Sequence, residues 1–170
     1  MERYRDTELH IVGPVRLPEV LKKSGSRVLR KPLMPYLEML RYLSKMDINI
    51  APLEQNNLFN DGKSELKIFE AALAGVPTIA SRIDSYSKCI ADGKNGFLAG
   101  SREEWIQKLS SLVENEELRI GMGLNARTDF VARFYIENTI DDIISVYEKI
   151  VDAYRSSELP STQYGVAFKK

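Results

Sequence analysis

Three charged side chains at helical spacing are the first residues of this sequence that could perform chemistry. Lys63, Lys67 and Glu70 occupy positions i, i+4 and i+7, so a helix that begins near Lys63 would place them on one side. The N-terminus of such a helix adds unpaired amides and a partial positive charge, and two cations beside it suit a phosphate group. A carboxylate one turn further along can accept hydrogen bonds from two sugar hydroxyls. Together they would suit a nucleotide diphosphate attached to a sugar.

A simpler interpretation of the same residues is an exposed ion pair. Lys67 and Glu70 are three positions apart, and such a pair on a helix surface contributes only about 0.2–0.5 kcal/mol. Charges at helical spacing are common. These three residues alone therefore favour the ion pair over a binding site.

The residues around this triplet predict a loop, a short helix, a sharp stop and a buried strand. Gly62 allows the loop backbone to approach a ligand closely, and Ser64 is a good N-cap for the helix. Gly75 stands where a left-handed C-terminal residue is expected, and Pro77 follows where the helix cannot continue. Residues 78–80 are typical of a strand inside a parallel sheet. The apolar stripe of the helix is expected to be Leu66, Phe69 and Leu73.

Residues 63–81, KSELKIFEAALAGVPTIAS, resemble the signature of group 1 glycosyltransferases, which have the GT-B fold. Four further motifs occur in the order of that family: HIVGP at 10–14, MDINIAPL at 46–53, IADGKNGFLA at 90–99 and ELRIGMGLNAR at 117–127. Each motif alone is weak, but five in sequence are a specific pattern. The resemblance implies a Rossmann-like α/β domain, the C-terminal half of a GT-B enzyme. The alternation of strands and helices also predicts a parallel sheet flanked by helices.

One part of the central motif departs from the usual family pattern. Gly62 stands where the family usually has a glutamate, and residues 63–65 replace a Gly-Phe-Gly. The chain instead resembles a Lys-Ser-x-x-Lys-x-x-Glu variant found in bacterial surface-polysaccharide transferases. The resemblance implies that Lys67 and Glu70 are the catalytic residues and that Glu70 holds the ribose hydroxyls. The donor pyrophosphate would be met by Lys63, Ser64, Glu65 and Lys67, through side chains and backbone amides.

The chain is expected to be a fragment of a longer enzyme that is inactive alone. In this family the nucleotide-binding domain begins with a strand and a helix that carry an Arg and a Lys for the pyrophosphate, and this chain starts after that unit. The N-terminal acceptor-binding domain of the same parent chain would be missing too. We expect a donor-binding domain at 1–155, truncated at its first β-α unit, and a polar tail at 156–170.

Composition restricts the partners of the chain. Its 170 residues suit one domain, and 44% are hydrophobic and 28% charged, as in ordinary globular proteins. Lysine plus arginine and aspartate plus glutamate both number 24, so no overall charge favours nucleic acid as a partner. No run approaches the roughly 20 apolar residues of a membrane span. The single Cys89 excludes an internal disulfide and fits the cytoplasm, while membrane association through the parent enzyme stays open.

Several further positions are candidates for contact with the donor. Gly13 ends a predicted strand and can bring the backbone close to a ligand, although Gly-Pro is equally a plain turn. Lone His10, without a second histidine or a nucleophile beside it, is expected to be structural. Arg30 and Lys31 follow another strand, where ligands of α/β sheets bind, but a solvated loop is the simpler assignment. Residues 54–57 form either a lid over the donor or only a connection.

The C-terminal part of the chain is predicted to be helical. Residues 101–104 form a capping box that opens one helix, and 116–134 are expected to form one or two more. The inward side chains of the first are expected to be Trp105, Leu109, Leu112 and Val113. Asn138 or Thr139 is expected to cap the last helix. Its apolar stripe, expected to lie in the core, consists of Ile140, Ile143, Ile144, Tyr147, Ile150, Val151 and Tyr154.

The resulting hypothesis is the donor-binding domain of a bacterial glycosyltransferase. It would transfer a sugar from a nucleotide diphosphate sugar to a glycan acceptor in polysaccharide or O-antigen biosynthesis. The resemblance implies retention of anomeric configuration and no catalytic metal, and the sequence contains neither an Asp-x-Asp motif nor a His/Cys cluster. The alternative is a non-catalytic interaction module on the same α/β scaffold, since fold does not fix function. Specific binding of a nucleotide diphosphate separates the two.

Overall fold

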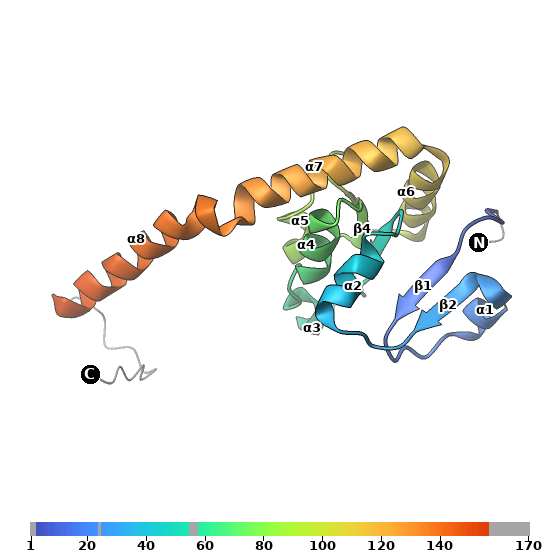
Figure 1. Ribbon diagram of the computed structural model, residues 1–170, viewed down its shortest axis with the longest axis horizontal. Coiled ribbons are helices and arrows are strands. Elements are labelled where there is room, and N and C mark those ends of the chain that lie inside the picture. Colours follow the sequence, from blue (N-terminus) through green and yellow to red (C-terminus); the bar gives the residue numbers. More distant parts are fainter. Residues whose placement is uncertain (1–2, 24, 55–57, 157–170) are drawn as a thin grey trace.

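The computed structural model describes residues 3–23, 25–54 and 58–156 (Figure 1). Its strands are β1 (Leu9–Val12), β2 (Val28–Lys31), β3 (Asn49–Ala51), β4 (Thr78–Ser81) and β5 (Phe97–Ala99). Its helices are α1 (Glu19–Lys22), α2 (Tyr36–Leu43), α3 (Leu58–Asp61), α4 (Leu66–Leu73), α5 (Asp84–Ser87), α6 (Arg102–Glu114), α7 (Glu116–Phe134) and α8 (Ile136–Arg155). Strands and helices alternate as far as β5, and only helices follow.

Every pairing between these strands is parallel. β1 pairs with β2, with Leu9 opposite Val28. β4 lies between β3 and β5, and its Ile79 is opposite both Ile50 and Phe97. The described strands thus form two sheets, one of two strands and one of three. Helices form the connections that parallel neighbours require, so the predicted α/β class is confirmed.

β4 is the centre of the larger sheet, and all four of its residues are buried. Successive side chains of a strand point to opposite faces of the sheet. Ala80 accordingly joins one core cluster, which contains Ala51, Ile68, Ala80, Ile83, Tyr86, Ile90 and Leu98. Ile79 joins the other, which contains Ile79, Ala99, Leu112 and Met122. The short strand predicted at this position is therefore the one around which both halves of the core are built.

The helix of the central motif, α4, starts later and presents a different face than predicted. It begins at Leu66 with Glu65 as N-cap and no side-chain cap bond, so the prediction of Ser64 as N-cap was wrong. The predicted apolar stripe was also wrong, because Leu66 and Leu73 are exposed and Phe69 is only half-buried. The buried face consists of Ile68, Ala71 and Ala72. Its two alanines allow α4 to approach β4 and α7 closely, which larger side chains would prevent.

The stop after α4 follows the prediction. Gly75 has a φ of +74°, in the left-handed region that glycine adopts without strain. α7 is one uninterrupted helix, and it crosses the C-terminal end of α4 at Gly123. The predicted capping box opens α6, where the Ser101 hydroxyl accepts a hydrogen bond from the Glu104 amide at 3.2 Å. The Glu104 carboxylate in turn accepts from the Gly100 amide, and the Ser101 amide adds a weaker contribution.

The motif at 90–99 forms the turn after α5 and then β5 itself. The Asp92 carboxylate accepts a hydrogen bond from the Leu98 amide at 2.9 Å. The side chain of Asn95 donates to the Asp129 carboxylate of α7, also at 2.9 Å. These bonds hold the turn against β5 and α7, so the polar residues of this motif serve the fold.

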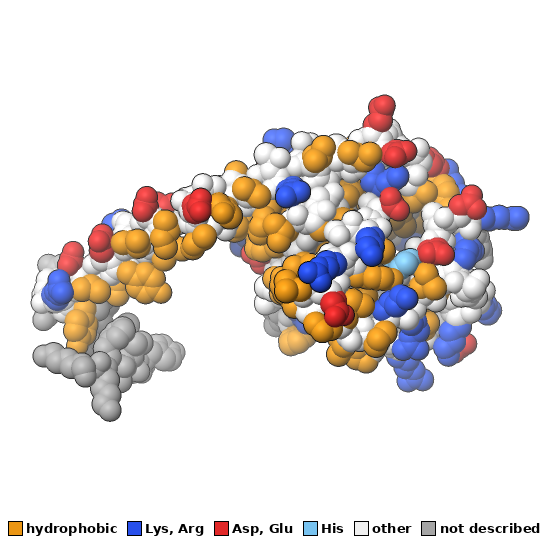
Figure 2. Space-filling view, viewed as in Figure 1, with side chains coloured by type: hydrophobic (Ala, Val, Ile, Leu, Met, Phe, Trp, Pro, Cys, Tyr) orange, Lys and Arg blue, Asp and Glu red, His pale blue; other side chains and the backbone are white. Residues whose placement is uncertain are grey.

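α8 extends away from the rest of the molecule (Figure 1). It begins at Ile136, after a break at Tyr135 where ψ is an extended 128°, so the predicted caps Asn138 and Thr139 were wrong. None of its residues is buried, and hydrophobic side chains gather along one side of it (Figure 2). The expectation that its apolar stripe lies in the core was therefore wrong. Among the described elements, α7 is the one that α8 chiefly contacts.

No helix within the described ranges is both long enough and apolar enough to cross a bilayer. Residues 55–57, most of the predicted polar loop, lie outside the described residues, and so do 157–170 of the predicted tail. The possible lid at 54–57 stays a prediction.

Candidate functional site

α4 places two of the predicted site residues, Lys67 and Glu70, beside each other. Lys67 is the second residue of the helix and is exposed, while Glu70 lies about one turn later and is half-buried. Side chains three positions apart on a helix are neighbours, and the two charges interact. The structure thus brings a cation and a carboxylate together at the start of a helix.

Three influences act on the Glu70 carboxyl. Burial is the largest, and it raises the pKa above the usual value. A hydrogen bond with the Tyr36 phenol and the positive charge of Lys67 lower the pKa without cancelling that rise. Tyr36 belongs to α2, far earlier in the chain, so no spacing pattern around Glu70 could have identified it.

Lys63 lies outside α4. Because the helix begins at Leu66, the prediction that Lys63 shares a helical side with Lys67 and Glu70 was wrong. The Lys63 ammonium instead lies over the ring of Phe59, 4.4 Å from the ring centroid. Lys63 can therefore reach a ligand only from the loop before the helix.

The first turn of α4 offers backbone donors next to the Lys67 side chain. The amides of Ile68 and Phe69 donate to the Glu65 carbonyl oxygen at 2.8 and 3.2 Å, so the helical hydrogen bonds start there. The amides of Leu66 and Lys67 precede these bonds, at the positions that a helix leaves without an internal partner. This turn is where the partial positive charge of the helix is greatest.

The remaining predicted site residues have other surroundings. Ser64 is exposed just before the helix. Glu65 acts on Tyr86 of α5. Burial is the main cause that raises the pKa of the Tyr86 phenol, and the negative charge of Glu65 raises that pKa further. Gly13 directly follows β1 with a φ of +105°, and its amide donates to the Lys31 carbonyl oxygen at 3.0 Å. In the described part of the chain, no hydrogen bond or ion pair joins Gly13 to α4.

Side-chain hydrogen bonds fix α4 and the segment after β3 to the larger sheet. The Asn49 amide group on β3 donates to the Lys67 carbonyl oxygen at 3.3 Å and to the Thr78 hydroxyl at 3.1 Å. The Ser81 hydroxyl on β4 accepts from the Leu53 amide and donates to the Leu53 carbonyl oxygen, both at 2.7 Å. Sequence reasoning missed both roles. The available signal was that each is a polar residue inside an apolar strand, which requires a hydrogen-bond partner when buried.

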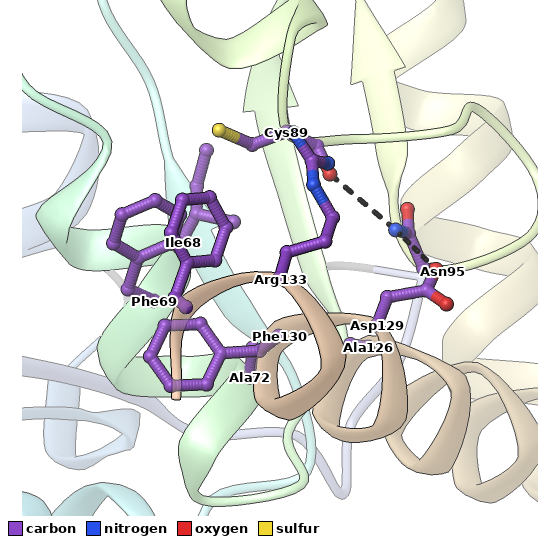
Figure 3. Close-up of a pocket in the computed structure, with 10 residues that line it drawn as sticks. Ile68, Phe69, Ala72, Cys89, Asn95, Ala126, Asp129, Phe130 and Arg133 are labelled. Atoms are coloured by element: carbon purple, nitrogen blue, oxygen red, sulfur yellow. Dashed lines mark hydrogen bonds between the residues drawn. The ribbon is translucent and has the colours of Figure 1, made fainter. Parts of the chain in front are cut away.

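The hollow drawn in Figure 3 is not the candidate site. It lies between α4 and α7, on a face of α4 that includes Ile68 and Phe69 but neither Lys67 nor Glu70. Its free volume of about 20 Å³ has room for a single water molecule. Such a hollow is a packing gap beside the Phe69 ring, far too small for a nucleotide sugar.

Comparison with known proteins gives the family. Residues 1–115 match the family described as Glycosyl transferases group 1. A D-inositol 3-phosphate glycosyltransferase of Corynebacterium urealyticum is 27% identical over 166 residues, which cover 88% of this chain and 37% of that protein. Spore coat protein SA of Bacillus subtilis is 29% identical over 84 residues, which cover 48% of this chain and 22% of that protein. The chain thus spans little more than a third of the length of the Corynebacterium relative.

Solved structures give the fold. Sucrose-phosphate synthase from Thermosynechococcus elongatus has a TM-score of 0.68 at 18% identity, over 86% of this chain and 39% of that one. HepE of Anabaena, solved in complex with UDP, has a TM-score of 0.67 at 18% identity, over 84% of this chain and 41% of that one. Both likenesses show the α/β architecture of GT-B glycosyltransferases. Because the family match covers more than half of its residues, the chain belongs to the group 1 glycosyltransferase family.

Proposed function

We propose that this chain is the donor-binding domain of a glycosyltransferase that moves a sugar from a nucleotide diphosphate sugar to a glycan acceptor. The observation that carries the proposal is α4, which holds the half-buried Glu70 carboxylate one turn after the exposed Lys67 at a helix start. Family membership supports the class of reaction. The structural relative HepE was solved with UDP and with UDP-glucose, which supports a nucleotide diphosphate sugar as the donor.

Each group at this helix start has a role in the proposal. The Glu70 carboxylate, which only accepts hydrogen bonds when ionised, receives the two ribose hydroxyls. Lys67 and the amides of the first turn meet the pyrophosphate, which the helix dipole also favours. Lys63 and Ser64 approach the same group from the loop. These donors stabilise the negative charge that develops as the nucleotide diphosphate leaves.

The proposal extends to the setting of the reaction. Residues 1–155 form the donor domain, and the acceptor site belongs to another part of a longer parent protein, since this chain spans 37% of the Corynebacterium relative. The Lys63-Ser64-x-x-Lys67-x-x-Glu70 pattern supports an acceptor in polysaccharide or O-antigen biosynthesis. We place the reaction in the cytoplasm, which the single Cys89 supports.

Calorimetric titration of the chain with UDP, GDP, dTDP and ADP tests the proposal. One of the four is expected to bind, and Glu70→Ala and Lys67→Ala are each expected to weaken that binding at least about tenfold, because each removes a charged hydrogen-bonding group. The identity of the nucleotide that binds would name the base of the donor.

Two matched substitutions on α8 control for a general effect of charge. Glu148→Ala and Lys149→Ala remove the same kinds of side chain from an exposed helix away from α4, and they are expected to leave the affinity unchanged. Binding of none of the four nucleotides, or equal weakening by all four substitutions, would contradict the donor-site proposal.

A further inference from the structure

Phe69 of α4 packs into a small aromatic cluster at the C-terminal end of α7. Its ring centroid lies 4.4 Å from that of Phe134 and 5.2 Å from that of Phe130 (Figure 3). The centroids of the two α7 rings are 5.6 Å apart, so the three rings form one cluster. Aromatic pairs at such distances attract each other beyond the effect of buried area alone. The cluster therefore joins the first half of α4 to the end of α7.

Other elements hold the α7 side of this cluster in place. The Arg133 guanidinium donates to the Lys88 carbonyl oxygen at 3.3 Å, and its carbon lies 5.2 Å from the centroid of the Phe134 ring. The Asp129 carboxylate accepts a hydrogen bond from the Asn95 side chain at 2.9 Å. Lys88 ends α5 and Asn95 belongs to the turn before β5, so neither partner comes from α4. The rings of α7 are thus placed independently of the helix that they contact.

A second contact holds the other end of α4 against the same helix. There the Gly75 carbonyl oxygen approaches Gly123 so closely that a Cβ on α7 would stand 2.1 Å from it. One contact near each end fixes both the direction of the α4 axis and the rotation of α4 about that axis. Successive residues of a helix are rotated by about 100°, so the direction of the Phe69 ring sets that of Glu70 beside it. The same rotation sets the direction of Lys67, two positions earlier.

We propose that Phe134 is a positioning residue for the donor site: its ring, packed on Phe69, sets the rotation of α4 at which the two charged side chains face the nucleotide diphosphate. The inference rests on the proposed function, because Phe134 acts only through α4. Phe134 is the last residue of α7, is 39% exposed and belongs to neither core cluster. Loss of its ring is therefore expected to disturb α4 more than the sheet.

Phe134→Leu removes the ring and keeps an apolar side chain. Residual dipolar couplings of the amides at 66–73, compared with those of β4, are expected to change, because α4 rotates when the ring contact is lost. Calorimetry at a temperature where both proteins are folded measures affinity for the nucleotide that binds the unaltered chain. That affinity is expected to fall about tenfold, because hydrogen bonds to a ligand weaken steeply once their geometry is altered.

Phe134→Tyr is the conservative variant, since it keeps the ring. The partial exposure of Phe134 allows the added hydroxyl to reach water, so this variant is expected to retain both the couplings and the affinity of the unaltered chain. Loss of affinity in Phe134→Tyr equal to that in Phe134→Leu would contradict a role of the ring.

Phe97→Leu is the matched control, because it makes the same change at a half-buried ring on β5, beside the core cluster of Ile79 and Leu112. It is expected to lower the free energy of unfolding at least as much as Phe134→Leu, and to alter neither the couplings of α4 nor the affinity. Unchanged couplings or unchanged affinity in Phe134→Leu, or an equal loss of affinity in Phe97→Leu, would overturn the role of Phe134. Absence of nucleotide binding by the unaltered chain, with the couplings changed in Phe134→Leu, would instead overturn the proposed function and this role with it, so the two failures are distinguishable.

Discussion

At the scale of single residues, Gly123 has no Cβ, and this allows α7 to pack closely against the C-terminal end of α4. A Cβ at this position would stand 2.1 Å from the Gly75 carbonyl oxygen and 3.2 Å from the Pro77 ring. Gly75 cannot easily withdraw, because its left-handed backbone ends α4 and its amide donates to the Ala72 carbonyl oxygen at 2.9 Å. The helix that carries Glu70 is therefore held from its C-terminal end by a contact that only glycine permits.

Gly123→Ala is expected to lower the free energy of unfolding by about 3 kcal/mol, because the added methyl group forces α7 away from the end of α4. Gly121→Ala on the same helix is the control. A Cβ there meets no atom within 4 Å, and alanine is favoured over glycine inside a helix by roughly 0.5–1 kcal/mol. Urea unfolding followed by circular dichroism measures both. Similar effects of the two substitutions would contradict the close crossing of α4 and α7.

The conformations of individual residues could be predicted where they depend only on neighbouring residues in the sequence. The left-handed conformation of Gly75 follows from its place between a helix and Pro77. The cap of α4 did not follow, because residue type identifies Ser64 as a suitable cap but does not fix where the helix begins, which is at Leu66. The influence of Tyr36 on the pKa of Glu70 joins distant segments, and no pattern in a single sequence reports such a pairing.

At the scale of elements, the spacing of apolar residues predicts which side of a helix faces inward, but it does not predict how deeply each side chain is buried. Four residues of α6 were expected to point inward, and Leu112 is indeed 0% exposed, in a cluster with Ile79 and Met122. Leu109 of the same helix is 37% exposed. How deeply a side chain is buried depends on which elements pack against that turn of the helix, and the spacing of apolar residues does not contain this information. The order and type of the elements could be predicted because each rests on its own local pattern.

The difference between these two leucines can be measured. Leu112→Ala is expected to cost about 3 kcal/mol of unfolding free energy, since it leaves a cavity against β4 and α7. Leu109→Ala makes the same chemical change on the same helix, where water already reaches the side chain, and is expected to cost about 1 kcal/mol or less. Denaturant titrations of both proteins give the comparison. A larger loss at Leu109 would show that α6 is rotated relative to the sheet from the orientation described.

At the scale of the whole molecule, the described part of the chain consists of a compact body, residues 3–23, 25–54 and 58–134, and the extended helix α8 (Figure 1). The sequence pattern of α8 predicts a core-facing helix, because its apolar residues form a continuous stripe. An amphipathic stripe indicates that a helix suits an apolar environment, but it does not identify the surface that provides one. In the described chain that stripe is largely exposed, so the body and α8 contribute differently to stability.

Equivalent substitutions in the body and in α8 test that division. Ile79 at the centre of the larger sheet is 0% exposed, and Ile144 on the stripe of α8 is 46% exposed. Ile79→Ala is expected to cost about 4 kcal/mol, because a fully packed side chain is replaced by a cavity. Ile144→Ala is expected to change the unfolding free energy by only about 0.5 kcal/mol, because it removes little buried area and alanine favours the helix. Comparable losses in denaturant titrations would mean that the stripe of α8 packs against the body in solution, in conflict with the extended arrangement.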